Sequence, residues 1–282
     1  MEKLISGKVR EVYQVTPDQL AIVTTDRVSA FDVILPTPIT DKGRVLNDLS
    51  SFWFRYTQDI VPNHMVSENP EDMPPELRGQ DFQGRTILVK KLKMLPFEFI
   101  VRGYLFGSMW KAYQKDGTFC GTALPAGMQL AQRLEKPIFT PSTKASAGHD
   151  ENVSVDYVAE KLGAEMAKKL EDTALALYKR CFDYAYERGI IIADTKVEFG
   201  LDQEGGLVLA DEVFTPDSSR FWSREAYQVG TSPESFDKQF LRDWLTEKGF
   251  AGQDPGPEIP AEVVAKTREK YLECRQRLVP QA

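Results

Sequence analysis

The sequence is poor in cysteine, and its three cysteines, Cys120, Cys181 and Cys274, are far apart and form no Cys-x-x-Cys pair. An odd number of widely spaced cysteines argues against a disulfide framework and against a zinc site. This usage is typical of proteins that work in a reducing compartment, so we expect a cytoplasmic protein.

Long apolar runs are also missing, since no segment approaches the ~20 apolar residues that a membrane-spanning helix needs. The first residues, Met1 to Leu4, lead directly into polar sequence, and no cationic stretch precedes an apolar one. The sequence therefore predicts neither secretion nor membrane insertion.

Positive charge is not in excess either. The 35 Lys and Arg residues are outnumbered by 42 Asp and Glu residues, which gives a formal net charge of −7 at pH 7. Such a surface repels nucleic-acid backbones and anionic membranes. We therefore expect no nucleic-acid and no membrane partner, and an anionic substrate would need a local basic pocket.

Four widespread fingerprints are absent: the Walker GxxxxGK[ST] loop, a GxGxxG after a strand, the GxSxG elbow and the HExxH helix. The HRDxxxxN loop and DFG triplet of protein kinases are absent too. The common nucleotide-binding and hydrolase motifs therefore do not account for this chain.

What is present is the composition of a globular protein, with 42% hydrophobic and 27% charged residues. A chain of 282 residues suits two lobes. Residues 1–94 read as a β-rich lobe with short strands at 8–15, 20–24, 33–35 and 86–92. One helix at 44–60 interrupts them and should lay an apolar stripe on that small sheet.

Residues 95–282 read as a larger α+β lobe. It begins with a strand at 97–101 and a helix at 105–115, followed by a long polar passage over 117–152. The strongest helical periodicity spans 162–184, and a hairpin turns at 202–206 between strands at 189–201 and 207–214. Ser232 and Pro233 predict the start of another helix, and a last helix spans 261–278.

A first candidate site is the stretch from Gly7 to Arg10, where glycine precedes Lys8 and Arg10 at the start of a strand. Alternate residues of a strand share a face, so both cations lie together beside backbone that a phosphate can approach. The alternative is an edge strand with a solvated lysine and arginine, and these residues alone favour it.

The hairpin carries the most informative pattern. Asp194, Lys196 and Glu198 share one strand face, and symmetry about the turn brings Glu198 roughly opposite Asp211. Two carboxylates that meet across a ladder repel each other unless a cation lies between them. Mg²⁺ that carries nucleotide phosphates suits such a pair. A surface hairpin with solvated acids is the alternative.

Two arginines mark a candidate anion site. Arg102 ends an apolar run and Arg220 follows the hairpin, and a guanidinium can hold a carboxylate or a phosphate by two parallel bonds. Either arginine could instead form an internal salt bridge. His149 and Asp150 lie in a loop rich in glycine and hydroxyl groups, where a ligand or a helix cap at Asn152 or Ser154 are both plausible interpretations.

Six segments in order along the chain resemble the SAICAR synthetase family. They are GKVREVY at 7–13, TDRVSAFDVILPTPITDKGRVLNDLS at 25–50, FIVRGYLFGS at 99–108, TPSTKASAGHDENVS at 140–154, ADTKVEFGL at 193–201 and LADEVFTPDSSRFW at 209–222. The loop at 140–154 is the longer variety found in one branch of that family. No motif identifies the residues that bind aspartate.

The resemblance implies a fold related to protein-kinase and ATP-grasp nucleotide binding, with ATP between the lobes. It implies a phosphate strand at Gly7, Lys8, Val9 and Arg10, a hinge along the adenine at Lys91, Leu92 and Met94, and Mg²⁺ on Glu198 and Asp211. It implies a ribonucleotide site at Arg102, Ser108, Asp217 and Arg220. Lys196, Lys144 and Asp150 would act beside the transferred phosphate.

The activity that the resemblance implies is ATP-dependent ligation of carboxyaminoimidazole ribonucleotide (CAIR) to L-aspartate in purine biosynthesis, through an acyl phosphate. A kinase-like phosphotransferase would not depend on aspartate, and a noncatalytic nucleotide-binding regulator would bind ATP without releasing phosphate. A nucleic-acid module fits least, given the net charge. The sequence leaves the oligomeric state open, a homo-oligomer included.

Overall fold

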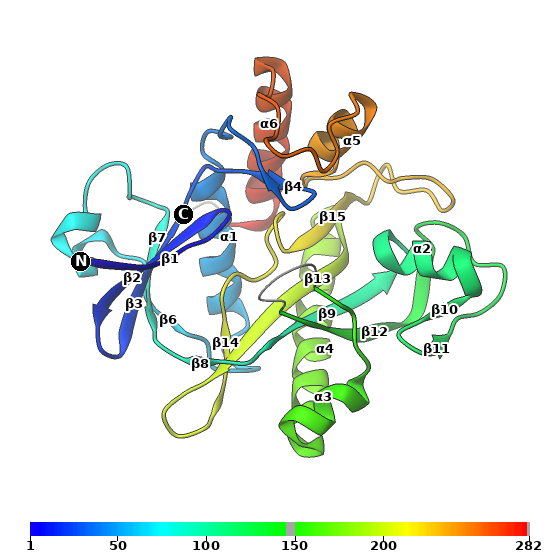
Figure 1. Cartoon of the computed structure of the whole chain (residues 1–282), viewed down its shortest axis with the longest axis horizontal. Helices are drawn as coiled ribbons and strands as arrows, with labels where there is room; N and C mark the ends of the chain where they lie inside the picture. Colours follow the sequence, from blue (N-terminus) through cyan, green and yellow to red (C-terminus); the bar gives the residue numbers. More distant parts are fainter. Residues whose placement is uncertain (145–149, 281–282) are drawn as a thin grey trace.

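The protein contains two main antiparallel sheets, in a computed structural model that describes residues 1–144 and 150–280. The N-terminal sheet has the order β1-β2-β3-β7-β6 and lies at the left of Figure 1. Its strands in that order are Glu2–Ser6, Arg10–Thr16, Gln19–Thr24, Thr86–Lys90 and Met65–Ser67. The sequence pattern predicts no strand at β1, which is an exposed edge strand.

The second sheet is built around β13 (Ile190–Leu201), which crosses the middle of the molecule in Figure 1. Its order is β12-β9-β13-β14, and β15 and β8 also pair with β13. The partners of β13 are β9 (Phe97–Tyr104), β14 (Leu207–Ala210), β15 (Ser219–Ser223) and β8 (Lys93–Met94). A single strand therefore joins the hinge region, the hairpin and the predicted ribonucleotide site.

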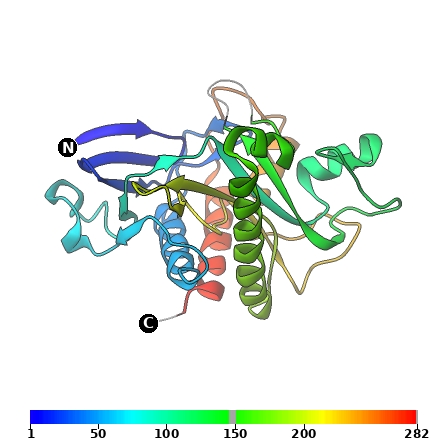
Figure 2. The ribbon, with the colours of Figure 1, turned by 90° about the horizontal axis from the view of Figure 1, so that it is seen from below.

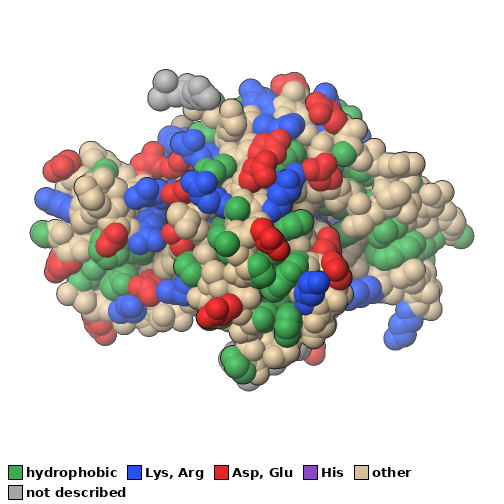
Figure 3. All heavy atoms as spheres, turned by 90° about the horizontal axis from the view of Figure 1, so that it is seen from above, with side chains coloured by type: hydrophobic (Ala, Val, Ile, Leu, Met, Phe, Trp, Pro, Cys, Tyr) green, Lys and Arg blue, Asp and Glu red, His purple; other side chains and the backbone are tan. Residues whose placement is uncertain are grey.

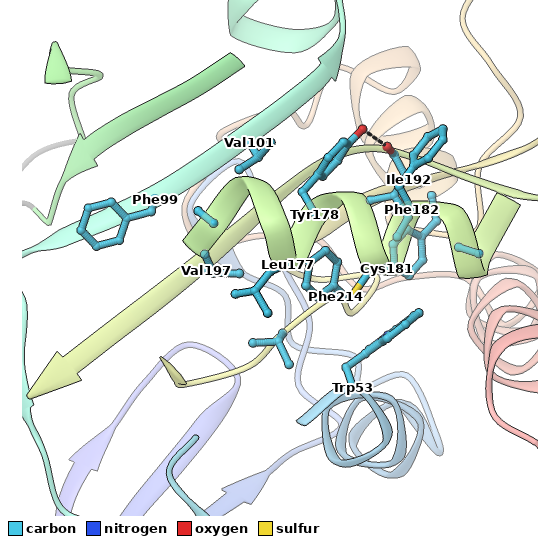
Figure 4. Packing of buried hydrophobic residues seen from close by; sticks show 14 of the residues in the cluster. Trp53, Phe99, Val101, Leu177, Tyr178, Cys181, Phe182, Ile192, Val197 and Phe214 are labelled. Atoms are coloured by element: carbon cyan, nitrogen blue, oxygen red, sulfur yellow. Dashed lines mark hydrogen bonds between the residues drawn. The ribbon is translucent and has the colours of Figure 1, made fainter. Parts of the chain in front are cut away.

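The two faces of β13 differ as its period-two pattern predicts. Val197 and Phe199 are 1% and 0% exposed and lie in the main core, whose packing around α4 (Ala164–Glu187) is drawn in Figure 4. Lys196 and Glu198 point to the other face, because successive side chains of a strand alternate. Burial of Val197 and Phe199 in the core therefore directs Lys196 and Glu198 to the opposite face of the sheet.

Three long helices lie side by side: α1 (Lys42–Tyr56), α6 (Ala261–Leu278) and α4 (Figure 2). α1 contacts β3 as expected, but its aromatic residues pack elsewhere. The ring of Trp53 lies 5.7 Å from that of Phe214 and 5.4 Å from that of Tyr184. The apolar stripe of α1 is therefore shared with the second half of the chain, and the expectation that it covers the small sheet holds for one side only.

The polar passage 117–152, for which the sequence predicts no element, contains β10 (Thr118–Phe119), β11 (Thr122–Ala123) and the long strand β12 (Arg133–Thr143). β12 contains prolines and still pairs with β9, because it is an edge strand. Proline is tolerated at an edge, where its missing N–H costs no ladder bond. α3 (Val155–Leu162) follows, and Ser154 caps it by accepting from the N–H of Tyr157 at 3.1 Å.

The helix predicted to begin at Ser232 and Pro233 begins instead at Gln239, as α5 (Gln239–Glu247). Residues 234–236 are extended because they pair with β15. The N–H of Ser223 donates to Glu234 (2.9 Å) and that of Phe236 to Phe221 (2.8 Å). Pairing with the sheet thus overrides a local capping signal.

The remaining elements are short, apart from α2 (Gly107–Asp116), which lies at the right of Figure 1. β4 (Ser29–Ala30) and β5 (Val33–Ile34) form a small hairpin, and 3₁₀ turns occupy Pro70–Asp72 and Pro75–Leu77. Within residues 1–144 and 150–280, no helix has the length and apolar character to cross a bilayer. Basic and acidic side chains are intermixed on the face shown in Figure 3.

Candidate active site

A pocket of about 250 Å³ lies between β9, β13, the turn before β15, and the start of α2. Its wall contains all four residues predicted to bind the ribonucleotide, and also Lys196. These residues are Arg102, Ser108, Asp217 and Arg220. Segments separated by more than a hundred residues therefore converge on one cavity.

Two arginines of this pocket share one carboxylate. Arg220 forms an ion pair with Asp194, and Nη1 of Arg102 lies 3.9 Å from the same Oδ2. Arg102 is 4% exposed and donates through Nε to Thr140 Oγ1 at 3.1 Å. Burial lowers the pKa of Arg102, which Asp194 opposes and Arg220 reinforces. Two guanidinium groups thus face one carboxylate, and this part of the pocket carries the net positive charge that an anion site requires.

Arg220 also has an unused donor, because its buried Nε has no hydrogen-bond partner among the described residues. The guanidinium lies against Gly107, the first residue of α2, where an added Cβ would come within 2.8 Å of Nη2. Among the residues that the structure describes, no side chain caps this helix end. The unpaired N–H groups of a first helical turn favour an anion, and Ser108 adds a hydroxyl there.

The carboxylates of the hairpin lie close together, but the register differs slightly from the predicted one. Glu198 pairs with Ala210, and Asp211 is the next residue, in the left-handed conformation (φ 63°). Burial raises the pKa of Glu198, and so does the nearby charge of Asp211. The predicted repulsion between the two carboxylates is therefore present.

Three cations surround this pair of carboxylates. Arg10 binds Asp211, with Nη1 2.7 Å from Oδ1, while Lys144 binds Glu198. Lys196 lies 3.6 Å from Glu198. Burial would raise the pKa of Asp211, but Arg10 and the lysines lower it. The two carboxylates thus lie in one cluster of cations, with the pKa of Asp211 lowered and that of Glu198 raised.

Lys196 itself is held in the charged form. Its Nζ lies 2.6 Å from Glu98 Oε1, on the neighbouring strand β9. Burial would lower the pKa of Lys196, but Glu198 and Glu98 raise it well above its ordinary value. An ammonium group with a raised pKa can neutralise developing negative charge and is unsuited to remove a proton near pH 7.

The donor set fits Mg²⁺ that arrives with a nucleotide. Within the described part of the chain, no group of three or more His, Cys, Asp or Glu residues could hold a metal alone. Glu198 and Asp211 supply two carboxylates, and Mg²⁺ commonly takes one or two of these while phosphate oxygens and water complete its coordination.

Near these carboxylates, residues Gly7, Lys8 and Val9 form the tip between β1 and β2. A Cβ at Gly7 would approach the carbonyl oxygen of Arg10 at 3.2 Å, so the tip is tight there. Nζ of Lys8 forms an exposed ion pair with Asp32, on the β4–β5 hairpin. Arg10, at the start of β2, is the tip residue that reaches the hairpin carboxylates.

The predicted hinge follows β7 and joins β13 through β8. Met94 pairs with Gly200, and the absent side chain of Gly200 makes room for this segment. An added Cβ there would come within 2.8 Å of Leu92 Cβ and 3.2 Å of Met94 Sδ. The main chain of Lys91 donates to Asp18 (2.8 Å). The hinge therefore lies directly beside the strand that carries Glu198.

The loop after β12 is described at its two ends. Lys144 reaches Glu198, as a role beside the transferred phosphate would require, and Asp150 is exposed. His149 lies outside the described residues. The helix cap that the sequence suggested for this stretch is confirmed at Ser154.

Asp217 lies at the edge of the pocket and is held by buried groups. It pairs with Lys42 at 2.8 Å, accepts from the hydroxyl of Tyr271 at 2.6 Å, and lies 3.6 Å from Nζ of Lys238. Burial would raise the pKa of Asp217, but Lys238 and Lys42 lower it.

The structure also brings Lys42, Asp194 and Arg242 to this site, and the sequence pattern gives none of them a role. Arg242 of α5 lines the pocket with the predicted residues. Asp194 could have been found, because it shares a strand face with Lys196 and Glu198. Lys42 pairs with Asp217, which is distant in sequence. Arg242 pairs with nearby Asp237, and only the fold brings it to the pocket formed by β9 and β13.

Comparison with known proteins gives one consistent result. Residues 3–257 match the family described as SAICAR synthetase. The phosphoribosylaminoimidazole-succinocarboxamide synthase of Thioalkalivibrio sulfidiphilus is 59% identical over 274 residues, which cover 96% of this chain and 93% of the relative. That of Maridesulfovibrio salexigens is 55% identical, with 96% and 92% covered.

Solved structures agree with these relatives. The SAICAR synthase of Saccharomyces cerevisiae complexed with SAICAR superimposes with a TM-score of 0.90 at 44% identity, over 98% of this chain and 94% of the other. A type-2 SAICAR synthetase in complex with ADP gives 0.72 at 27% identity, with both chains fully covered. The α+β, SAICAR synthase-like fold expected from the sequence is confirmed.

Proposed function

The chain belongs to the SAICAR synthetase family, and we propose that separate groups of its residues bind the ribonucleotide and ATP. The enzyme is an ATP-dependent carbon-nitrogen ligase of purine biosynthesis. It condenses CAIR with L-aspartate and yields SAICAR, ADP and phosphate. The assignment of residues, the requirement for Mg²⁺ and the cytoplasmic location are our proposals.

The ribonucleotide would bind in the 250 Å³ pocket. Its phosphate would accept hydrogen bonds from Arg220, from Ser108 and from the first turn of α2. Support comes from the unpartnered Nε of Arg220 and the uncapped start of that helix. Arg102 would hold the substrate from the β9 side, and Asp217 would keep the 215–220 turn in place at the pocket edge.

ATP would lie between two lobes, residues 1–94 and residues 95–282. The adenine would lie along Lys91, Leu92 and Met94, and the phosphates would lie against Gly7, Lys8, Val9 and Arg10. Glu198 and Asp211 would hold Mg²⁺, which supplies positive charge to the β- and γ-phosphate oxygens when it is bound. The closeness of the two carboxylates and the cations around them support this placement.

We propose that the reaction passes through an acyl phosphate, because a carboxylate does not react directly with an amine at neutral pH. A carboxylate oxygen of CAIR attacks the γ-phosphorus, and the bond to ADP breaks. The amine of aspartate then attacks the carbonyl carbon, the carbon-nitrogen bond forms, and phosphate leaves while the amine loses a proton. Lys196 would stabilise the transferred group, with Lys144 and Asp150 nearby.

One observation carries this assignment: the predicted ribonucleotide residues and Lys196 share one pocket, and Glu198 follows on the same face of β13. The test is phosphate release from ATP and Mg²⁺ with CAIR, with and without L-aspartate, in wild type and Arg102→Gln. We expect phosphate release that requires aspartate, with one SAICAR formed per phosphate. In the Arg102→Gln variant, the KM for CAIR should rise while the KM for the other substrates stays the same. A variant with unchanged KM for CAIR would refute the pocket assignment, while phosphate release without aspartate would indicate a phosphotransferase.

A further inference from the structure

Three successive carbonyl groups at the tip between β1 and β2 are held by one neighbouring segment. Arg27 donates through Nη2 to the carbonyl of Gly7 (3.0 Å) and through Nε to that of Lys8 (3.2 Å). Thr25 donates to the carbonyl of Val9 twice, through its N–H (2.9 Å) and its hydroxyl (2.7 Å). The whole tip is therefore fastened through its acceptors.

Arg27 is itself fixed in place by a carboxylate. Its Nη1 lies 3.1 Å from Oε1 of Glu11, on β2. Glu11 also accepts from the hydroxyl of Tyr13 at 2.6 Å and lies 2.9 Å from Nζ of Lys3. All three nitrogens of the guanidinium thus have defined partners, and a planar guanidinium with fixed partners has little freedom to turn.

Two of the three main-chain donors of the tip, in contrast, remain available. The N–H of Gly7 donates within the tip to Arg10 at 2.8 Å. The N–H groups of Lys8 and Val9 have no acceptor among residues 1–144 and 150–280. Successive main-chain N–H groups in a turn form a concavity that binds anions, whereas exposed carbonyl oxygens would repel phosphate. Holding the carbonyls aside favours the orientation that a phosphate needs.

We propose that Arg27, assisted by Thr25, is a positioning residue that fastens the tip formed by Gly7, Lys8 and Val9 so that its free N–H groups meet the phosphates of the nucleotide. Arg27 acts through the tip and does not itself contact the nucleotide. The inference rests on the proposed binding of nucleotide phosphates at this tip.

The experiment compares two ligands, ATP with Mg²⁺ and adenosine, for wild type and Arg27→Gln by calorimetry or competition. Losing hydrogen bonds from a charged donor should weaken ATP binding by roughly tenfold. Adenosine has no phosphate, so its affinity should stay the same. Arg27→Lys should recover only part of the ATP affinity, because one ammonium cannot span two carbonyls and a carboxylate.

Arg78 provides a matched control on the same half of the chain. Its Nε donates to the carbonyl of Met73 at 2.8 Å and its Nη2 to that of Glu71 at 2.9 Å, so it fastens another loop in the same way. Arg78→Gln should leave the affinities for ATP and adenosine unchanged.

Three outcomes would decide against the proposal or its premise. Equal losses for ATP and adenosine in Arg27→Gln would make Arg27 a structural residue only, and so would a loss in Arg78→Gln as large as that in Arg27→Gln. Unchanged ATP affinity in Arg27→Gln and Arg27→Lys would overturn the proposal directly. Failure of the wild type to bind ATP more tightly than adenosine would instead refute the phosphate role of the tip.

Discussion

Arg10 and Asp211 join the N-terminal sheet to the hairpin of β13 and β14 through a bidentate ion pair. Nη1 of Arg10 lies 2.7 Å from Oδ1 of Asp211, and Nη2 lies 3.0 Å from Oδ2. The residues are 201 positions apart. A bidentate guanidinium fixes direction as well as distance, so the pair sets the N-terminal tip against the hairpin. Nη2 also reaches Glu212 at 3.1 Å, and Arg10 therefore bridges two successive carboxylates.

The first prediction concerns the proposed magnesium carboxylates. Glu198→Gln or Asp211→Asn should lower kcat by about 10²- to 10³-fold, because catalysis of phosphoryl transfer depends mainly on stabilising the charge of the transferred group. Both variants should also need more Mg²⁺ for half-maximal rate. Initial rates over a magnesium titration measure both effects.

Glu204 offers the control for these substitutions. It lies exposed in the turn of the same hairpin, away from the paired carboxylates. Glu204→Gln should keep the wild-type rate and the wild-type dependence on Mg²⁺. Full activity of Glu198→Gln at low Mg²⁺ would mean that Glu198 is not a metal ligand.

The local sequence pattern predicts which way the side chains of β13 point, but it does not predict the register of the partner strand β14. Alternation along the sequence correctly places Val197 in the core and Lys196 in the cleft. The register at Asp211 could not be read from symmetry about the turn, because a left-handed residue ends the ladder there. A non-glycine residue in that conformation is uncommon, so no sequence rule anticipates it.

The rest of the site depends on contacts between distant segments. Arg102 and Arg220 stand out in sequence as charges beside apolar runs, and both were predicted. Lys42 lies in a helix among ordinary polar residues, and only the fold shows that it is buried against Asp217. The strand β12 is not predicted for a similar reason. Its prolines are compatible with a strand only at the edge of a sheet, and the sequence does not show that β12 lies there.

The second prediction tests the contact between Gly107 and Arg220. Gly107 has a φ of 60°, and an added Cβ would lie 2.8 Å from Nη2 of Arg220. Gly107→Ala should therefore displace the guanidinium and raise the KM for CAIR by roughly tenfold, as expected for a lost charged hydrogen bond. Steady-state kinetics with CAIR varied gives the value, and the KM for ATP should stay constant.

Gly117 separates this contact from backbone strain. It lies at the other end of α2 with a φ of 73°, and an added Cβ would meet no atom of residues 1–144 or 150–280 within 4 Å. Gly117→Ala should cost about 1 kcal/mol of stability, since alanine is strained where φ is positive. Its KM for CAIR should equal that of the wild type; a similar rise in both variants would attribute the effect to strain.

The third prediction is a pH dependence of stability that arises from His64. The side chain is 3% exposed, its ring lies 5.1 Å from that of Phe54, and burial lowers its pKa to about 4. An unfolded histidine has a pKa near 6.5, so between these values the unfolded chain binds a proton that the folded chain does not. Stability should therefore fall as the pH falls from about 6.5 to about 4, by roughly 3 kcal/mol in total.

Urea unfolding of wild type and His64→Gln across this pH range isolates that contribution. The glutamine cannot take up a proton, so its free energy of unfolding should fall less steeply with decreasing pH. Parallel pH profiles would show that His64 is protonated equally in the folded and unfolded states.

The fourth prediction concerns the buried ion pair of Lys42 and Asp217, whose side chains are 0% and 4% exposed. The pair joins α1 to the 215–220 turn at the pocket edge. Tyr271 and Lys238 contact the same carboxylate, which ties α6 and the start of α5 to the same point.

Lys42→Met should lower the free energy of unfolding by about 3 kcal/mol, because removal of one partner leaves a buried charge with weaker compensation. Lys168→Met provides the comparison, since Lys168 pairs with Asp172 on the exposed face of α4, with 65% and 59% of the side chains exposed. Exposed pairs contribute little, so that variant should unfold at the wild-type urea concentration. Equal midpoints for both variants would mean that Lys238 and Tyr271 alone suffice to hold Asp217, and that α1 is attached to the pocket by its apolar contacts.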